Sequence, residues 1–296
     1  MHSPNNFPNL KPFVKWVGGK TTSIPSLLEY IPEHISTYVE PFVGSGAVLM
    51  ALNFDKAIIN DSNSELINAY NVIKSNLGEL EFYLSTLIYD RKLYDEIRSW
   101  DREPDFDKRS AVERAARFIF LMKTCYNGLY RVSKKNFFNT PFGNYKNPTI
   151  CDTQTLEACS SFFNQKDIRI LCQDYQTLLE IIPKDAFVYL DPPYFPVSKT
   201  ANFTQYQSGN FKQDEHQRLY EFCLELHRRG IKFLQSNSDV PHIRELYRDF
   251  NINTVAVSRR INSNTSKRNA VNELIITNYD KDSFELVKIG KGNLKI

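Results

Sequence analysis

The sequence predicts an α/β fold: a mostly parallel sheet with helices on both faces, interrupted by a helical insertion. Short runs rich in β-branched or aromatic residues, each bounded by polar or turn residues, predict the strands. These runs are Ser36–Val39, Ala57–Ile59, Ile168–Leu171, Phe187–Leu190, Ile231–Gln235, Asn253–Val257 and Glu273–Thr277. Helical patterns lie between several of them, at Ser23–Tyr30, Glu215–Arg229 and Val240–Asp249. Such alternation of strands and helices is typical of a parallel sheet with both faces covered.

One region breaks this alternation. Between residues 64 and 163 the periodicity is mainly helical, in the segments Ser64–Ile73, Leu77–Tyr89, Ser110–Lys123 and Thr153–Phe163. An irregular loop, Thr124–Ile150, separates the last two segments. We therefore expect a sheet domain built from residues 1–63 and 164–296, into which residues 64–163 are inserted as a helical domain.

Composition places the chain among ordinary globular proteins, because 42% of its 296 residues are hydrophobic and 24% are charged. No stretch approaches the roughly 20 apolar residues of a membrane span, and the polar segment Met1–Leu10 does not resemble a secretory signal. The five cysteines form no CxxC pair and no His/Cys cluster. We therefore expect a cytoplasmic protein with reduced thiols, no structural zinc or other metal, and no membrane association.

Basic residues are concentrated in one part of the chain, although the net charge is only +3. From Arg114 to Cys151 there is no acidic residue, and the basic residues are Arg114, Arg117, Lys123, Arg131, Lys134, Lys135 and Lys146. Aromatic residues are interleaved with them: Phe118, Phe120, Tyr126, Tyr130, Phe137, Phe138, Phe142 and Tyr145. Basic side chains neutralise phosphates and flat rings stack on bases, so this stretch suits nucleic acid. A solvated basic face whose rings lie in a core explains it equally well.

A glycine-containing turn follows the first predicted strand and opens a helix, in Tyr38-Val39-Glu40-Pro41-Phe42-Val43-Gly44-Ser45-Gly46. Glycines allow a tight turn and a close approach of the backbone to a ligand, although the turn could be purely structural. The dinucleotide fingerprint GxGxxG fails because Leu49 stands where its third glycine belongs, which disfavours a nicotinamide or flavin enzyme. Asp61 ends the next strand, where a carboxylate can bind ribose hydroxyls or cap the following helix.

The segment Lys15-Trp16-Val17-Gly18-Gly19-Lys20-Thr21 ends in the same three residues as a phosphate-binding P-loop. A P-loop requires a glycine where Val14 stands, and a preceding strand that this sequence does not show. A nucleotide-hydrolysing enzyme is therefore disfavoured. A tryptophan flanked by lysines instead suits a ligand that carries a carboxylate and an aromatic base.

The motif Asp191-Pro192-Pro193-Tyr194 directly follows the predicted strand that ends at Leu190. Two prolines fix φ and remove two backbone donors, while their carbonyls remain available as acceptors. A carboxylate, a rigid carbonyl and a ring at one strand end can accept both hydrogens of a planar amine and stack on its ring system. The structural alternative is a proline-rich turn with an exposed tyrosine, which the position after a buried strand disfavours.

In order and spacing, these motifs resemble those of Dam-type DNA adenine N6-methyltransferases, the alpha-group members of the D12 class. The motifs that carry the resemblance are Lys-Trp-Val-Gly-Gly-Lys, Glu-Pro-Phe-Val-Gly-Ser-Gly, Asn60-Asp61, Tyr126-Asn127-Gly128-Leu129-Tyr130-Arg131, Thr140-Pro141-Phe142-Gly143 and Asp-Pro-Pro-Tyr. The resemblance extends from about Lys11 to Tyr279, and the bacterial GATC-methylating members, orphan or restriction-linked, look closest. It implies a Rossmann-like methyltransferase sheet that binds S-adenosyl-L-methionine, with residues 64–163 as an inserted helical DNA-recognition domain.

The resemblance also implies roles for individual residues. Asp191, Pro192, Pro193 and Tyr194 match the catalytic motif, in which Tyr194 stacks on a flipped adenine. The positions that match cofactor-binding residues are Trp16, Lys20, Phe42, Gly44, Gly46, Asp61, Asp174, Tyr175 and Asp191. Those that match target-sequence contacts, or residues that fill the gap beside the extruded base, are Lys15, Tyr126, Asn127, Leu129, Arg131, Pro141 and Tyr145. Lys134 is expected on phosphates. The basic loop with Arg259 and Arg260 is similar in kind to a DNA-binding loop, whereas Tyr130 stands where the family varies.

We therefore expect a site-specific adenine-N6 methyltransferase that acts on double-stranded DNA and flips adenine out of GATC, with no obligate protein partner. A methyltransferase for protein glutamine or for RNA shares the amine-binding chemistry. Such enzymes usually have Asn in place of Asp191, and they leave the basic, aromatic insertion unexplained. A DNA-binding protein without catalysis does not account for the complete motif at residues 191–194, and measuring cofactor binding would distinguish it from an enzyme.

Overall fold

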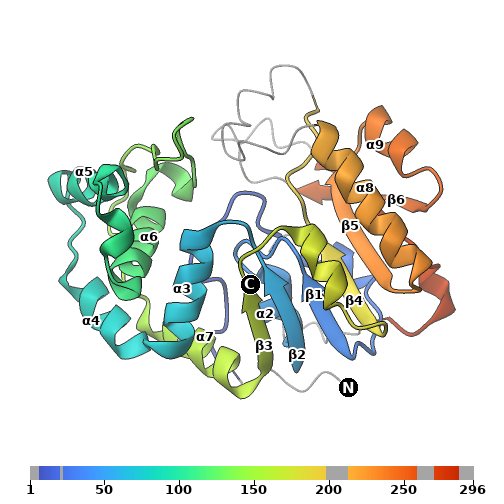
Figure 1. Cartoon of the computed structure of the whole chain (residues 1–296), viewed down its shortest axis with the longest axis horizontal. Coiled ribbons are helices and arrows are strands. Elements are labelled where there is room, and N and C mark those ends of the chain that lie inside the picture. Colours follow the sequence, from blue (N-terminus) through green and yellow to red (C-terminus); the bar gives the residue numbers. More distant parts are fainter. Residues whose placement is uncertain (1–6, 21–22, 198–212, 259–269, 287–296) are drawn as a thin grey trace.

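The residues that the structure describes form one seven-stranded sheet (Figure 1). The structure is a computed structural model that describes residues 7–20, 23–197, 213–258 and 270–286. The strands are β1 (Thr37–Glu40), β2 (Lys56–Asn60), β3 (Asp167–Leu171), β4 (Ala186–Leu190), β5 (Lys232–Ser238), β6 (Asn251–Ser258) and β7 (Ala270–Thr277). Their order is β3-β2-β1-β4-β5-β7-β6. The first five are parallel, whereas β7 is antiparallel to β5 and β6. The predicted, mostly parallel α/β sheet is therefore confirmed.

The middle of the parallel part lies deep in the molecule. β1 and β4 are buried along their whole length, as expected for strands that are covered on both faces. β1 lies between β2 and β4, so the chain moves outward from β1 through β2 and β3 before it returns to β4 on the other side. Open α/β sheets bind ligands outside the carboxyl ends of their strands at such a reversal. A binding site is therefore expected at the carboxyl ends of β1 and β4.

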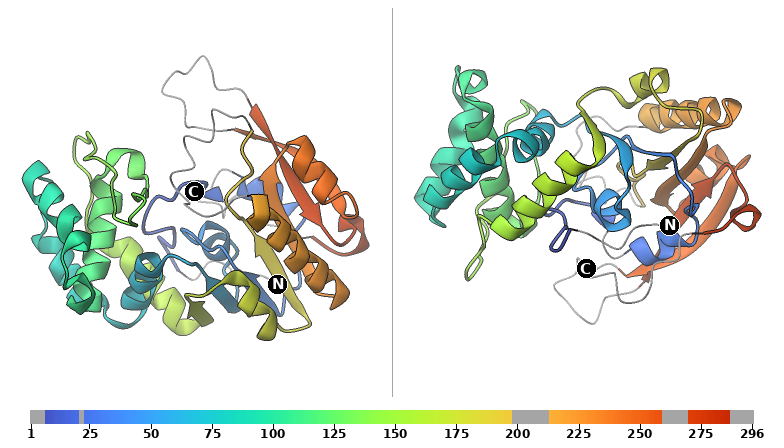
Figure 2. Two further views of the ribbon diagram at one scale, coloured as in Figure 1. Left: turned by 45° about the horizontal axis from the view of Figure 1, so that its top comes forward. Right: turned by 90° about the horizontal axis from the view of Figure 1, so that it is seen from below.

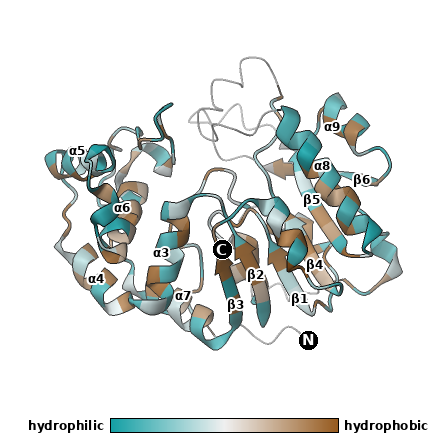
Figure 3. Ribbon diagram, viewed as in Figure 1, coloured by the Kyte–Doolittle hydropathy of each residue, from teal (hydrophilic) through white to brown (hydrophobic). Residues whose placement is uncertain are grey.

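Helices cover both faces of the sheet, as predicted (Figure 2). On one face, a core of buried residues unites the sheet with α8 (Gln213–Arg228), α9 (Pro241–Leu246) and the 3-10 helix η5 (Tyr175–Glu180). The core of the other face includes α1 (Ile24–Leu28) and α2 (Ala47–Leu52). Figure 3 shows hydrophobic residues along the central strands and polar residues on the outward sides of the helices. No helix among the described residues is long and apolar enough to cross a membrane.

The segment from residue 64 to residue 163 is helical apart from its loops. Its α-helices are α3 (Ser64–Ser75), α4 (Leu77–Thr86), α5 (Arg91–Ser99), α6 (Ala111–Thr124) and α7 (Thr153–Gln165). The predicted helix to Tyr89 ends earlier, at Thr86, and α5 was not expected from the sequence. Asp90 begins α5 by accepting a hydrogen bond from the backbone N–H of Leu93 at 2.8 Å. This cap begins a helix that follows α4 after a short break.

The insertion helices and one face of the sheet share a single hydrophobic core. The ring of Tyr70 in α3 packs edge-on against Phe13, at 5.0 Å between ring centroids, and against Phe163 in α7, at 5.6 Å. The same cluster of buried side chains includes Tyr38 and Ile59 of the sheet. The boundary between the expected domains thus runs through a continuous apolar interior.

The loop between α6 and α7 is irregular, as predicted. It contains the short 3-10 helix η4 (Tyr126–Gly128) and two isolated β-bridges, Cys125 with Phe142 and Val132 with Phe138. The second bridge makes a small hairpin whose tip carries Lys134 and Lys135. Hydrogen bonds from Tyr94, Arg98 and Arg102 to backbone carbonyls of this loop hold it against α5 and η2 (Trp100–Arg102).

Candidate active site and DNA interface

The glycine turn lies at the carboxyl end of β1, where the sheet topology predicts a ligand site. Gly44 and Gly46 have φ values of +48° and +69°, which only glycine adopts without strain. The backbone N–H of Gly44 donates to Oδ2 of Asp61, at 3.1 Å, across the ends of β1 and β2. A Cβ at Gly44 would lie 2.6 Å from Cδ1 of Trp16, so the indole packs directly on the turn. The structure thus brings Trp16, Gly44, Gly46 and Asp61 together, as the sequence predicted.

Asp61 does not cap the helix that follows it. The N-cap of α3 is Asn63, whose side chain accepts from the backbone N–H of Leu66 at 3.0 Å. Asp61 instead accepts from Gly44 N–H and from Asn63 N–H, the latter at 2.9 Å, and burial raises the pKa of its carboxyl. The capping alternative for Asp61 is therefore wrong, and its part in ribose binding stays a prediction.

Asn60 joins three strand ends beside the glycine turn. Its Nδ2 donates to the carbonyls of Pro41 and Gln173, at 3.1 and 3.0 Å, and its Oδ1 accepts from Gln173 N–H at 3.0 Å. Pro41 follows β1 and Gln173 follows β3. One amide side chain thus fixes the positions of the loops that leave β1 and β3.

The side chains of the remaining predicted cofactor residues are only partly accessible to a ligand. Phe42 is half-buried against the ring of Tyr175, with 5.0 Å between ring centroids, and Tyr175 is itself buried against Phe222. Asp174 is exposed, caps η5 and pairs with Arg218 at 3.2 Å. Phe42, which follows β1, therefore packs on Tyr175, the chain neighbour of Asp174, while Tyr175 itself belongs to the core of that face.

The motif at residues 191–194 leaves the end of β4 and meets the segment 15–20. Oδ1 of Asp191 lies 2.9 Å from Nζ of Lys20 and accepts a hydrogen bond from Oγ of Ser236 at 2.8 Å. Nζ of Lys20 also lies 4.3 Å from the centre of the Tyr194 ring. Pro192 is buried and Pro193 half-buried. The sequence placed Lys20 with the cofactor, but the structure pairs it with the predicted catalytic carboxylate.

Burial controls the electrostatics of this cluster. It raises the pKa of the Asp191 carboxyl above its ordinary value, although Lys20 and Ser236 act in the opposite direction. Burial lowers the pKa of Lys20, but Asp191, Tyr189 and Glu273 together outweigh this effect, and the net shift is upward. At the end of β1, burial raises the pKa of Glu40 well above its usual range, and the Tyr38 hydroxyl donates to Glu40 Oε2 at 3.0 Å.

The sequence analysis missed two polar residues of this cluster, Ser236 on β5 and Glu273 on β7. Glu273 Oε2 accepts from the hydroxyl of Tyr194 at 3.0 Å, which fixes one end of the tyrosine. A signal was present at Ser236, because the run Gln235-Ser236-Asn237-Ser238 is polar although it belongs to a buried strand. Glu273 has no such signal, because it enters the site only through the pairing of β7 with β5.

The predicted DNA contacts meet at the junction of the segment 15–20 with the loop after α6. A Cβ at Gly128 would lie 3.0 Å from Cβ of Lys15, so the two segments touch. The side chains of Lys15, Tyr126 and Asn127 are exposed, with 53% of Tyr126 accessible, and Lys134 and Pro141 are exposed further along. Leu129 is half-buried. Most of these residues are therefore exposed at the protein surface, while Arg259 and Arg260 lie outside the described residues.

Two predicted contact residues make hydrogen bonds within the protein. Nε of Arg131 donates to Oδ1 of Asn139 at 2.7 Å, and one terminal nitrogen of its guanidinium donates to the Asn139 carbonyl at 3.1 Å. The hydroxyl of Tyr145 donates to the Cys125 carbonyl at 2.8 Å, so its hydrogen is not available to a partner. Because Asn139 takes one edge of the guanidinium, the other edge of Arg131 keeps its N–H groups for a ligand.

The acid-free stretch divides between the core and this surface. Arg117 is buried and pairs with Asp101 at 2.9 Å, and Arg114 pairs with Glu65. The rings of Phe118, Phe120 and Phe138 are buried, as the structural interpretation of the stretch requires. Tyr126, Lys134, Lys135 and Lys146 are exposed, as the nucleic-acid interpretation requires. The structural interpretation therefore describes the buried part of the stretch, and nucleic-acid binding stays a prediction for its exposed part.

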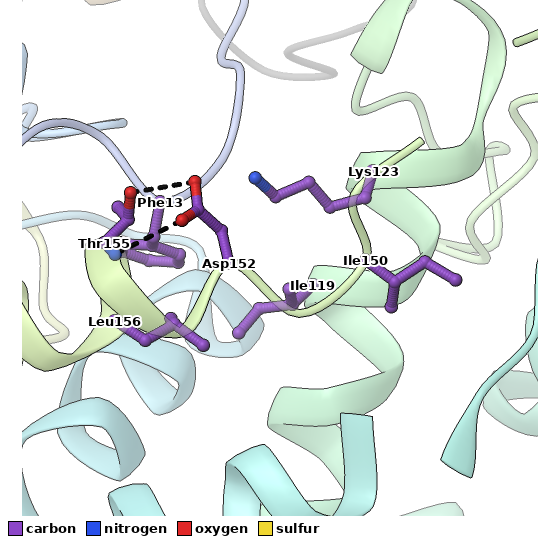
Figure 4. Close-up of a pocket in the computed structure, with 7 residues that line it drawn as sticks. All are labelled: Phe13, Ile119, Lys123, Ile150, Asp152, Thr155 and Leu156. Atoms are coloured by element: carbon purple, nitrogen blue, oxygen red, sulfur yellow. Dashed lines mark hydrogen bonds between the residues drawn. The ribbon is translucent and has the colours of Figure 1, made fainter. Parts of the chain in front are cut away.

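A hollow beside the insertion helices does not belong to this site (Figure 4). It has no space for a water molecule. The side chains that line it are Phe13, Ile119, Lys123, Ile150, Asp152, Thr155 and Leu156. Burial there lowers the pKa of Lys123. None of these residues was predicted to contact cofactor or base.

Comparison with known proteins assigns these motifs to one family model. Residues 16–261 match the model described as D12 class N6 adenine-specific DNA methyltransferase. The Type II methyltransferase M1.LlaDCHI of Lactococcus lactis subsp. cremoris is 40% identical over 273 residues, which cover 92% of this chain and 96% of that protein. The Type II methyltransferase M.MjaIII of Methanocaldococcus jannaschii is 42% identical and covers 91% and 99%. The DNA adenine methylase of Escherichia coli is 33% identical and covers 89% and 93%. The matches include the glycine turn, the insertion and the motif at residues 191–194.

Proposed function

The chain belongs to the D12 class of N6 adenine-specific DNA methyltransferases, enzymes that take their methyl group from S-adenosylmethionine, and we propose that its target is the adenine of GATC in double-stranded DNA. The proposal includes flipping of the adenine out of the duplex and assigns residues 64–163 to target recognition. The observation that carries it is the cluster at the end of β4, where Asp191 and Tyr194 contact Lys20 of the segment 15–20, whose Lys15 in turn contacts the basic loop at Gly128. We further propose that the protein acts on DNA in the cytoplasm.

The residues at the carboxyl ends of β1 and β2 fit S-adenosylmethionine. The turn at Gly44 brings backbone and indole so close that no Cβ fits between them, and Asp61 presents a carboxylate beside it. A carboxylate in this position suits ribose hydroxyls, and the Trp16 indole suits an aromatic base. When bound, S-adenosylmethionine supplies an electrophilic methyl group on a positively charged sulfur. Trp16, Gly44, Gly46 and Asp61 are the residues that we assign to holding it.

Asp191, Pro192 and Tyr194 are assigned to the adenine. The amino nitrogen of adenine is a weak nucleophile because its lone pair is delocalised into the ring. If the Asp191 carboxylate and the Pro192 carbonyl each accept one amine hydrogen, the nitrogen is favoured in a pyramidal form with a localised lone pair. Tyr194, held by Glu273, offers a ring for stacking. These residues position the nucleophile and stabilise the charge that develops on it.

The GATC target is supported by the motifs Tyr126–Arg131 and Thr140–Gly143 and by the hydrogen bonds that orient the Arg131 guanidinium. Asn139 orients the Arg131 guanidinium, and a guanidinium edge can bind O6 and N7 of guanine in the major groove. The exposed ring of Tyr126 lies beside Asn127, and an exposed ring can fill the gap that an extruded base leaves in the stack.

Digestion of treated DNA tests this function. DNA incubated with the protein and S-adenosylmethionine is cut with two endonucleases that recognise GATC, of which only one is blocked by adenine methylation. We expect resistance to the blocked enzyme alone, and no resistance with Asp191→Ala, a variant that should still bind duplex DNA. Incorporation of labelled methyl groups without resistance would refute GATC as the target. Absence of incorporation into any duplex would refute the assignment of the site.

A further inference from the structure

The two carboxylate oxygens of Asp191 have unequal surroundings. Oδ1 receives both the Lys20 ammonium at 2.9 Å and the Ser236 hydroxyl at 2.8 Å. Within the described part of the chain, neither a hydrogen bond nor an ion pair reaches Oδ2. The carboxylate is thus fixed through one oxygen, and the other is available to a ligand.

Lys20 is built into the site rather than lying on its surface. Its side chain is 7% exposed, and its Nζ lies 3.4 Å from the carbonyl of Gly18 and 4.3 Å from the centre of the Tyr194 ring. Water therefore screens its charge little. An ammonium in such a place has a strong effect on the ionisation of the carboxylate that it contacts.

The other charged and titratable groups around Asp191 oppose its ionisation. Glu40 at the end of β1 and Glu273 on β7 are buried acids, and each repels the Asp191 charge. Tyr189 on β4 is buried and Tyr194 of the same segment is half-buried, and the Ser236 hydroxyl is neutral. Of these described groups, Lys20 is the cation that offsets the cost of a buried carboxylate. Without it, Asp191 would hold its proton to a higher pH.

We propose that Lys20 is a positioning residue for methyl transfer: together with Ser236 it holds Oδ1 of Asp191 and keeps the carboxylate ionised, so that Oδ2 accepts a hydrogen of the target amine. The proposal rests on the proposed function, and it gives Lys20 a part different from the cofactor contact that the family resemblance implies. A protonated Asp191 would offer the amine a hydroxyl donor in place of an acceptor, and the acid form of the enzyme would be inactive.

The pH dependence of kcat/KM with a GATC duplex tests this assignment. In Lys20→Met, the acid limb of the profile should move to higher pH by about 1–3 units, the usual effect of one opposite charge on a carboxyl. Activity is then lost most at low pH and recovered in part at high pH. Lys20→Gln, which keeps a hydrogen-bond donor without its charge, should shift the limb in the same direction.

Two matched variants separate charge from geometry. Lys20→Arg keeps the charge, and its acid limb should lie closer to that of the wild type than the limb of Lys20→Gln. Ser236→Ala removes only the neutral hydrogen bond, so kcat should fall with a smaller shift of the limb than in Lys20→Met. Calorimetry of S-adenosylmethionine binding should give nearly the wild-type affinity for Lys20→Met.

The inference is overturned if the limb stays in place while the affinity for S-adenosylmethionine falls, because Lys20 is then a cofactor contact. The inference is also overturned if the acid limbs of Lys20→Gln and Lys20→Arg lie at the same pH. This comparison remains decisive if urea titrations show that Lys20→Met is not folded. If the wild type methylates GATC and the acid limb does not move in the Lys20 variants, only the role of Lys20 is contradicted. An inactive wild type contradicts the proposed function instead.

Discussion

Replacing Gly44 with alanine should cost stability through two separate effects. Gly44 has a φ of +48°, and an L-residue in the left-handed region costs roughly 1–2 kcal/mol. The new Cβ would also lie 2.6 Å from Cδ1 of Trp16, and overpacking of this kind costs about 1–3 kcal/mol. We therefore expect Gly44→Ala to lower the free energy of unfolding by about 2–5 kcal/mol. Displacement of the indole should also weaken S-adenosylmethionine binding.

Gly230→Ala is the matched control for Gly44→Ala. Gly230 has a φ of +72°, but a Cβ there would meet no atom within 4 Å, so only the backbone cost of roughly 1–2 kcal/mol applies. Equilibrium unfolding in urea measures both variants, and calorimetry measures their cofactor affinity, which Gly230→Ala should leave unchanged. Equal destabilisation of the two variants, or unchanged cofactor affinity in Gly44→Ala, would refute the view that Trp16 and the turn form one tightly packed unit.

Four further variants test other parts of the molecule. Arg131→Ala should relax discrimination at one guanine by about 1–3 kcal/mol, whereas Lys134→Ala should weaken binding to all duplexes alike. Single-turnover methylation of duplexes with one substituted base pair measures both effects. An equal loss of activity on every duplex with Arg131→Ala contradicts the assignment of Arg131. Asp61→Ala should weaken cofactor binding by about 1.5–3 kcal/mol in calorimetry, and an unchanged affinity would leave Asp61 a structural role. Burial lowers the pKa of His216 to about 4. As the pH falls, the imidazole is therefore protonated in the unfolded chain before it is protonated in the folded protein. About 3 kcal/mol of the free energy of unfolding should be lost as the pH falls from about 6.5 to 4. Urea titrations at several pH values measure this loss, which His216→Phe should lack.

The sheet was predictable because its strands are buried apolar runs between turn residues, and burial along a strand leaves a clear pattern in the sequence. α5 was missed because Arg91–Ser99 is mostly charged, with only Leu93, Tyr94 and Ile97 to mark its buried side. The end of α4 was placed too late because Leu87 and Ile88 continue the apolar pattern after the helix has ended. Patterns of apolar residues predict which elements form better than they predict where each one stops.

The candidate site was predictable as far as it depends on neighbouring parallel strands. The glycine turn, Asp61 and Asp191 all follow strands of one parallel sheet, and the ends of such strands lie at one edge. Glu273 was not predictable in the same way. It lies beside Ser238 because β7 is antiparallel and is inserted between β5 and β6, and nothing in the sequence around Glu273 states this order. The pairing of Lys20 with Asp191 was likewise hidden, because it joins segments far apart in the chain.

The common core of the insertion and the sheet limits how a change of target sequence can arise. An insertion taken from a relative would need side chains that fit Phe13 and Tyr38 as well as its own helices, so exchange of the whole segment would disturb folding of the catalytic part. The hairpin tip at Lys134 and Lys135 is exposed and lies outside that core. New specificity is therefore more accessible through small substitutions along the exposed loop than through shuffling of domains, and engineering of this enzyme should start at that loop.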